Sequence, residues 1–297
     1  MRVLMIGLGD IARKAYVPVL AARPDIELHL TSRDPVVLAE IGDAFRLAHR
    51  HTSVAAALAA ARFDAALVHA STEAHPALVR LLLEQDIATF VDKPLADQFD
   101  TVEALVALAA RRATPLVVGF NRRFAPDYVA LRGVGASLIT LEKHRHRQPD
   151  TPRRVVFDDF IHVVDTLLSL APAAVRRRTI ETHVVDGLLH AVTLVLAGDG
   201  FTAIGTMHRN SGLDEERLDA IGDGARRTVL NLADRIDASG ARTLRRRGDW
   251  VSVARQRGFD TMCDHFLTVA RERRATDAAA ILQTHALCEA IVRHAAG

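Results

Sequence analysis

The sequence predicts an α/β protein in which a doubly wound parallel sheet is followed by an α+β domain with an antiparallel sheet. Up to about residue 120, short apolar runs typical of strands alternate with helical stretches, which indicates a parallel sheet covered on both faces. Beyond Gly119-Phe120-Asn121, hairpin signals join the strand-like runs instead. We therefore expect two domains, residues 1–120 and 121–297. The closing helices are candidates for packing back on the first domain.

The first domain changes from strand to helix in short steps. We expect strands at residues 2–6, 26–31, 65–70, 89–91 and 116–118, and helices at residues 11–22, 35–45, 74–84 and 99–111. The helix from residue 35 opens with Pro35 directly after Asp34, which is a common helix start.

The second domain has longer strand patterns and fewer helices. We expect strands at residues 137–147, 179–185, 188–196, 202–208, 217–221 and 228–232, and helices at residues 159–170, 259–273 and 278–295. The turns Asp186-Gly187, Gly198-Asp199-Gly200 and Asp223-Gly224 are typical of hairpins.

Composition excludes several classes of function. The chain has 297 residues, a net charge of +2 and no basic stripe interleaved with aromatic residues, so a nucleic-acid partner is not expected. Cys263 and Cys288 are isolated thiols, which suit a reducing compartment. There is no signal-peptide pattern and no apolar run that could span a membrane, so we expect a cytoplasmic protein. The 14 histidines form no recognisable ligand pattern, and no metal is predicted.

A glycine motif directly after the first strand predicts a dinucleotide site of the Rossmann type. In Gly7-Leu8-Gly9-Asp10-Ile11-Ala12, the first glycine allows a tight turn and the second lets the backbone approach a pyrophosphate. Ala12 still permits close helix–strand packing, and the helix N-terminus faces the phosphates. Gly7, Gly9, Asp10, Ile11 and Ala12 are therefore expected to contact the cofactor.

The end of the second strand bears on the choice of cofactor. An NAD site usually places an acid there, whereas this chain has Ser32 and Arg33. A hydroxyl followed by a guanidinium suits a 2′-phosphate, so NADP(H) is favoured. NAD(H) is the alternative, with Asp34 as the ribose acid if the strand ends one or two residues later.

Lys93 is one of only three lysines among 38 basic residues, and it lies at the end of a predicted strand. A lysine can shift its pKa and exchange a proton, which arginine does not do. In the second domain, Asp158 and His162 are four residues apart in a helical stretch, so they are expected to share one helix face. A carboxylate beside an imidazole orients the ring for proton transfer.

Three motifs together resemble the Gfo/Idh/MocA family of NAD(P)-dependent oxidoreductases: GLGDIA at residues 7–12, DKPLA at 92–96 and DDFIHVVD at 158–165. GFNRRFAP at residues 119–126, the triplet MHR at 207–209 and RGF at 257–259 are similar to the MviM-type branch. The resemblance covers essentially the whole chain. It implies a Rossmann domain followed by a domain with a large, open, mostly antiparallel sheet, and a homodimer or homotetramer formed through that sheet.

The resemblance also implies roles for individual residues. Lys93 matches the lysine that lies beside nicotinamide and substrate, with Asp92 in place of the usual glutamate. Asp158 and His162 match the family's acid and histidine, and His162 is the expected acid/base. Phe160 stands where a small residue is common, which bears on the substrate. The remaining expected cofactor contacts are Ser71, Thr72, His75, Asp92 and Lys93.

The expected reaction is hydride transfer between nicotinamide and a hydroxyl or carbonyl carbon of a sugar, cyclitol or related polyol. Besides Lys93, Asp158 and His162, the expected substrate contacts are Arg122, Lys143, Arg145 and His208, for which a solvated charge is the other interpretation. Two alternatives remain open. One is a non-catalytic NAD(P)-binding sensor or regulatory protein, and the other is a reductase of an imine or conjugated double bond.

Overall fold

The computed structural model describes residues 1–275 and 277–297. It divides into two compact units. Unit 1 consists of Met1–Gly119 with Phe259–Leu282, and unit 2 consists of Phe120–Gly258 with Gln283–Gly297. Over the described ranges, no helix is both long and apolar enough to cross a membrane.

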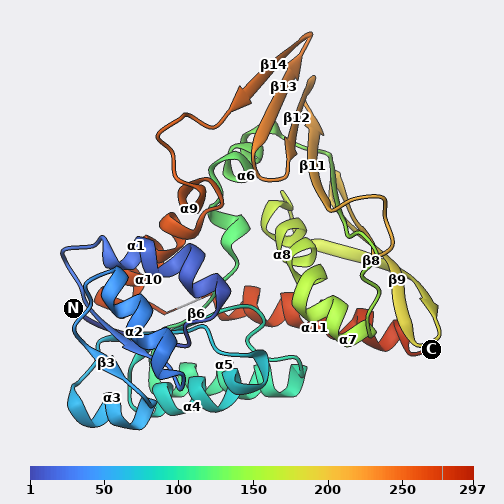
Figure 1. Cartoon of the computed structure of the whole chain (residues 1–297). Coiled ribbons are helices and arrows are strands. Elements are labelled where there is room, and N and C mark those ends of the chain that lie inside the picture. The colour runs from blue at the N-terminus through green and yellow to red at the C-terminus, as the bar shows by residue number, and fades with distance from the viewer. Residues whose placement is uncertain (276) are drawn as a thin grey trace. The chain divides into compact units, whose positions relative to one another are not determined.

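Unit 1 is built on a six-stranded parallel sheet with the strand order β3-β2-β1-β4-β5-β6 (Figure 1). The strands are β1 (Arg2–Ile6), β2 (Glu27–Thr31), β3 (Arg50–His51), β4 (Ala65–Val68), β5 (Ala88–Val91) and β6 (Leu116–Val118). The chain winds outward from β1 to β3 and then from β4 to β6, so the direction of winding changes between β1 and β4. Strands β4 and β5 are buried along their whole length, as expected for central parallel strands.

Helices cover both faces of this sheet. They are the π-helical turn Ala12–Tyr16, α1 (Val17–Ala21), α2 (Pro35–Ala44), α3 (Val54–Ala60), the 3₁₀ turn Thr72–Ala74, α4 (His75–Glu84), α5 (Phe99–Arg112) and α10 (Phe259–Glu272). Helices α1 and α10 pack together, as do α4 and α5, and Figure 1 shows the two pairs on opposite sides of the sheet. Helix α11 (Ala278–Ala295) begins in unit 1 and ends in unit 2.

Unit 2 is built on an eight-stranded sheet with the strand order β14-β13-β12-β11-β7-β10-β9-β8. The strands are β7 (Leu138–His144), β8 (Val175–Val185), β9 (Leu188–Gly198), β10 (Phe201–His208), β11 (Glu215–Gly222), β12 (Ala225–Leu230), β13 (Asp234–Ser239) and β14 (Ala241–Arg246). Neighbouring strands are antiparallel except β7 and β10, which are parallel. The fold class predicted from the sequence is confirmed in both units.

Apart from the part of α11 that belongs to unit 2, the one long helix described in this unit is α8 (Ile161–Leu170), which packs across β7 and β10. The others are the 3₁₀ turns Asn121–Phe124 and Arg132–Val134, α6 (Pro126–Leu131), α7 (Pro152–Val155), the π-helical turn Val156–Phe160 and α9 (Val253–Gln256). Gly205 on β10 makes the close approach of α8 feasible. A Cβ there would lie 2.4 Å from Val163 Cγ1 and 2.8 Å from Leu167 Cδ1.

Several elements differ from the sequence prediction. Strands β3, β13 and β14 and helices α3, α6, α7 and α9 were not predicted. The first helix was expected to be regular from residue 11 to 22, but its first part is a π-helical turn. The helix expected from residue 159 begins earlier, because α7 and a second π-helical turn precede α8.

Candidate functional site

The predicted cofactor residues of unit 1 gather at one edge of the parallel sheet. Gly7 follows β1, Ser32 follows β2, Ser71 lies in the loop after β4, and Lys93 follows β5. Because parallel strands end at the same edge, these four positions lie at the carboxyl edge of the sheet. The change of winding direction between β1 and β4 opens a crevice at this edge in doubly wound sheets.

The turn after β1 leaves no room for a side chain at Gly7. Its φ is +88°, and a Cβ would lie 2.8 Å from the carbonyl oxygen of His69 and from the amide nitrogen of Ala70. At Gly9 nothing lies within 4 Å of the position that a Cβ would take. A side chain at Gly9 would therefore fill open space above the turn, which is the space a pyrophosphate needs. This turn fits a dinucleotide.

The first helical turn supports the same interpretation. The first helical hydrogen bond runs from the amide of Arg13 to the carbonyl oxygen of Gly9. The amide groups before Arg13 therefore have no partner within the helix. Ala12 is fully buried, which allows the helix to pack closely on the sheet. Asp10 and Ile11 are exposed, and Asp10 forms an ion pair with Lys14 at 2.7 Å. Exposed amide groups at a helix N-terminus attract phosphate.

The residues after β2 bear on the choice between NADP(H), bound by Ser32 and Arg33, and NAD(H), bound by Asp34. Asp34 is the N-cap of α2, and its Oδ1 accepts from the amides of Val36 at 2.9 Å and Val37 at 3.3 Å. Ser32 is half-buried and its Oγ accepts from the Asp34 amide at 3.2 Å. Arg33 is exposed. A capping interaction therefore engages the Asp34 carboxylate, while Arg33 extends toward solvent.

Asp92 is bound within unit 1 by two neighbours. The Tyr16 hydroxyl donates to Oδ1 at 2.7 Å, and Nδ1 of His69 lies 2.7 Å from Oδ2. Burial acts to raise the pKa of Asp92, but the charge and hydrogen bond of His69 outweigh it and lower the pKa. Burial and the neighbouring Asp92 raise the pKa of Tyr16 well above its usual value. This predicted cofactor residue thus has both carboxylate oxygens engaged beneath the end of β5.

Lys93 is half-buried, and the peptide bond to Pro94 is cis. His75 lies beneath this turn, with Nδ1 2.8 Å from the Pro94 carbonyl oxygen and Nε2 3.0 Å from that of Ala70. His75 is 1% exposed, so it joins the loop after β4 to the loop after β5. Ser71 and Thr72 begin the 3₁₀ turn of the β4 loop, where Ser71 is exposed.

In unit 2, Asp158 lies in the π-helical turn and His162 in the first turn of α8. A π turn closes hydrogen bonds from residue i to i+5, so the regular α-helical spacing assumed for this pair does not apply. The Asp158 side chain is 49% exposed and lies 3.7 Å from Arg154. His162 is half-buried, and its carbonyl oxygen accepts from the Thr166 hydroxyl at 2.7 Å.

Three of the predicted substrate contacts meet in one buried ion cluster. We use this name for Arg122, Lys143, Arg145, Asp159, Arg209 and Glu216. Arg122 donates from Nε and Nη2 to the two oxygens of Glu216, at 2.8 and 2.6 Å. Lys143 lies 3.2 Å from both Glu216 and Asp159 and therefore joins the two acids.

Asp159 collects the other cations of the cluster. Arg145 donates to both of its oxygens, at 2.7 and 2.9 Å, and Arg209 donates from Nη1 at 2.7 Å. Burial acts to raise the pKa of Asp159, but the charge of Lys143 and the bonds from Arg145 outweigh it and lower the pKa to about 2. Burial, followed by the charge of Arg122, lowers the pKa of Lys143. Arg122 and Lys143, two of the predicted substrate contacts, are thus buried and paired with acids.

His208 and Asp165 lie outside this cluster. His208 is exposed at the end of β10, and its Nδ1 accepts from the Asn210 amide at 3.1 Å. Arg209, the next residue, takes the buried position. Asp165 is buried and accepts from Arg123 at 2.6 to 3.0 Å, so this acid fastens α8 to the 3₁₀ turn Asn121–Phe124.

Sequence reasoning missed the acids that organise the cluster. Neither Asp159 nor Glu216 was predicted as a site residue, although each binds two or more predicted cations. One signal was present. On β7 the buried positions alternate as Ile139, Leu141 and Lys143, so the lysine occupies a core position and needs an acid opposite it. That partner is Glu216, which pairs with Lys143 in the register of β7 and β11.

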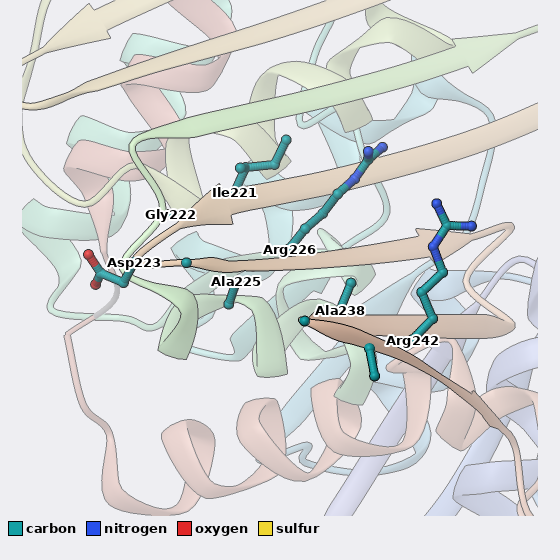
Figure 2. A pocket seen from close by; sticks show the side chains of 10 residues that line it. Ile221, Gly222, Asp223, Ala225, Arg226, Ala238 and Arg242 are labelled. Carbon is teal, nitrogen blue, oxygen red and sulfur yellow. The ribbon is translucent and has the colours of Figure 1, made fainter.

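A hollow of about 400 Å³ lies at the tips of the outer hairpins of unit 2. The β11–β12 turn and the β13–β14 turn line it, and Figure 2 shows Arg226 of β12 and Arg242 of β14, two strands separated by β13, extending in the same direction. None of the predicted site residues lines this hollow. It is therefore not a candidate for the dinucleotide site.

Unit 1 has a glycine turn that fits a pyrophosphate at the switch point of a doubly wound sheet. Unit 2 supplies an α+β domain with acids and a histidine on its main helix. This combination defines a class of protein, the nicotinamide dinucleotide-dependent oxidoreductases with a separate second domain.

Comparisons with known proteins identify the family. Residues 1–120 match the oxidoreductase family with an NAD-binding Rossmann fold, and residues 126–238 match a YceM-like C-terminal domain. YceM of Salmonella typhimurium, which is named only as an oxidoreductase, is 34% identical over 290 residues, covering 94% of this chain and 92% of that one. The chain therefore belongs to the Gfo/Idh/MocA oxidoreductase family, and its cofactor is a nicotinamide dinucleotide.

Two further relatives are informative. The solved structure of a dehydrogenase (MviM) from Clostridium difficile has a TM-score of 0.93 at 29% identity and covers 99% of both chains. Myo-inositol dehydrogenase Hyg17 of Streptomyces leeuwenhoekii is 51% identical over 69 residues, which is 23% of this chain and 21% of that one. The first supports the predicted MviM-type branch, and the second is a polyol dehydrogenase similar over a short segment.

The low pKa of Asp159 predicts a loss of stability in acid. Its folded pKa of about 2 lies below the unfolded value, so the unfolded state binds more protons between the two. The contribution of the Asp159 carboxylate to the free energy of unfolding is therefore present above about pH 4, and it is lost as the pH falls through about 2. Asp159 alone accounts for about 2–3 kcal/mol. The free energy of unfolding by urea, followed by circular dichroism from pH 7 to 2, measures this.

Asp159→Asn tests the assignment. The variant leaves Arg145 and Arg209 without their acid and Lys143 with Glu216 alone, and it should lose about 3–5 kcal/mol at pH 7, with a flatter pH dependence below pH 4. Asp199→Asn is the matched control, because Asp199 forms only an exposed pair with Arg176 and should change stability by less than about 1 kcal/mol. An Asp159→Asn curve parallel to the wild-type curve would contradict the role of this acid.

Proposed function

We propose that the protein transfers a hydride between a nicotinamide dinucleotide and a hydroxyl or carbonyl carbon of a sugar, cyclitol or related polyol. The observation that carries this proposal is the arrangement of unit 1. Lys93 follows β5 at the same edge of the sheet at which Gly7 and Gly9 form the dinucleotide turn. The similarity of a segment to a myo-inositol dehydrogenase supports the polyol class.

Each catalytic residue has a distinct role in the proposal. When bound at Gly7, Gly9 and the first helix, the dinucleotide would supply the hydride-transfer chemistry. His162 takes the hydroxyl proton during oxidation and returns it during reduction, and Asp158 stabilises the charged imidazole. Lys93 donates a hydrogen bond to the reacting oxygen and so stabilises the charge that develops on it.

Removing the Lys93 amine or the His162 imidazole should slow turnover without weakening the binding of the cofactor. His162→Ala should lower kcat by about 10²–10⁴-fold, the contribution of a general acid–base group. Lys93→Met should lower kcat by about 10²–10³-fold, the contribution of a donor to the oxygen on which charge develops. The Kd for the cofactor should change by less than about threefold, since Gly7, Gly9 and the first helix are unchanged. The absorbance of the reduced nicotinamide, followed by stopped flow with a panel of polyols, measures kcat. Fluorescence titration with the cofactor measures its Kd.

His183→Ala is the control for His162→Ala, because His183 is exposed on β8 and has no assigned role. Wild-type turnover in both catalytic variants would overturn the residue assignment. Tight cofactor binding without consumption by any polyol would favour the sensor interpretation. Reduction of an imine or conjugated double bond, identified by product analysis, would favour the interpretation of the protein as a reductase of such bonds.

We propose that NADP(H) is preferred over NAD(H). The Asp34 carboxylate caps α2, while the exposed guanidinium of Arg33 and the hydroxyl of Ser32 are available beside it for a 2′-phosphate. Arg33→Ala should raise the Kd for NADPH about 10- to 100-fold, the value of a charge-assisted hydrogen bond, and leave the Kd for NADH unchanged. Equal effects on both nucleotides, or tighter wild-type binding of NADH, would contradict the preference.

We also propose that copies of the chain associate through the face of the eight-stranded sheet opposite α8. Val195 and Ile204 face this side, paired across β9 and β10, and both are only half-buried. A half-buried apolar sheet face favours association. Light scattering should give a molar mass of a dimer or tetramer, and Ile204→Arg should shift it toward the monomer. A monomeric wild type at micromolar concentration would contradict this.

A further inference from the structure

A group of imidazoles and one carboxylate lies on the edge of the parallel sheet, outside the dinucleotide turn. We call Glu27, His29, His49 and His51 the edge histidine cluster. Glu27 and His29 lie on β2, His51 lies on β3, and His49 directly precedes β3. The register pairs Thr31 with His51, and the Leu30 amide donates to the His49 carbonyl oxygen, so His29 and His49 are neighbours across the two strands.

The ligand atoms of three members converge. One nitrogen of His29, one of His49 and one oxygen of Glu27 all lie within 4.8 Å of one another. His29 Nε2 is 2.8 Å from Glu27 Oε1, and His49 Nε2 is 4.0 Å from the same oxygen. The rings of His29 and His49 are stacked, with centroids 4.2 Å apart and planes at 10°.

The buried member of the group is held in position from behind. His29 is 3% exposed, and its Nδ1 lies 3.1 Å from Nε2 of His51. The rings of Phe63 and His29 form a T-shaped contact, with centroids 4.9 Å apart and planes at 88°. When a histidine binds a metal through one nitrogen, its other nitrogen commonly donates to a neighbour that fixes the ring. His51 stands in that position relative to His29.

We propose that Glu27, His29 and His49 bind one zinc ion, with His51 orienting His29. In the protein without metal, a proton between His29 Nε2 and Glu27 Oε1 accounts for their 2.8 Å separation, and zinc would replace that proton. Bonds of about 2.0–2.1 Å in a tetrahedron separate ligand atoms by about 3.3 Å. His29 and Glu27 therefore move apart slightly, and His49, half-exposed on the loop, moves closer. Water completes the fourth position.

The ligand chemistry selects the class of metal. Two imidazoles and a carboxylate suit Zn²⁺ and its borderline neighbours, whereas Mg²⁺ and Ca²⁺ require oxygen ligands. Arg2 is a competitor, because its Nε donates to the same Glu27 oxygen at 3.0 Å. This predicts opposite effects for two neighbouring changes. Loss of His49 should weaken zinc binding, and loss of the Arg2 charge should preserve or strengthen it.

Isothermal titration of the untagged, chelator-treated full chain with ZnCl₂ tests the site. The wild type should bind one equivalent, and His49→Ala and Glu27→Gln should each raise the Kd at least about tenfold, the smallest effect expected for a ligand. Arg2→Gln should bind as tightly as the wild type or more tightly. Zinc should raise the melting temperature of the wild type and of Arg2→Gln, but not of His49→Ala.

His183→Ala, on β8 of unit 2, is the matched control and should leave zinc binding unchanged. The proposal is overturned if the wild type shows no saturable binding near one equivalent. It is also overturned if His49→Ala binds like the wild type, or if His183→Ala weakens binding as much as His49→Ala does. NADPH affinity measured in parallel keeps this result separate from the proposed redox function.

Discussion

The turn at Gly7 is the constraint on which the cofactor site depends. The backbone passes so close to His69 and Ala70 that a Cβ would lie 2.8 Å from main-chain atoms, and φ is in the left-handed region. Only glycine meets both conditions. The close approach brings the end of β1 against the loop after β4, so the first helix begins at the switch point of the sheet. Every other residue at this edge is placed relative to that turn.

A network of side-chain hydrogen bonds lies beneath the loops that follow β4 and β5. Tyr16 and His69 hold both oxygens of Asp92, and His75 lies between the carbonyl oxygens of Ala70 and Pro94. These side chains come from the first helix, the β4 loop and the start of α4. Their hydrogen bonds hold the residues on either side of Lys93, namely Asp92 and Pro94. The family glutamate is replaced by an acid whose shorter side chain is fully engaged in this network.

The sequence was sufficient for the parts of the fold that follow from local pattern. The alternation up to residue 118 and the glycine turns of the second half predicted most strands, because burial sets their period. Strands β13 and β14 were not predicted, since Arg235, Asp237, Arg242 and Arg245 give them polar side chains in place of an apolar face. The two-residue strand β3 was too short to recognise. Without β3, the approach of His49 to His29 could not be inferred.

The two adjacent acids of the π-helical turn show where sequence patterns reach their limit. Asp158 and Asp159 differ in position by one residue, yet Asp159 lies among three cations and Asp158 is half-exposed. The sequence motif predicted a role for Asp158. Lys143 and Arg209 are buried and therefore need an acidic partner, which is Asp159. These ion pairs connect the π-helical turn to the ends of β7 and β10. Asp158 and His162 belong neither to this cluster nor to the pair of Asp165 with Arg123, and neither is fully buried, which is why we propose the chemistry for them.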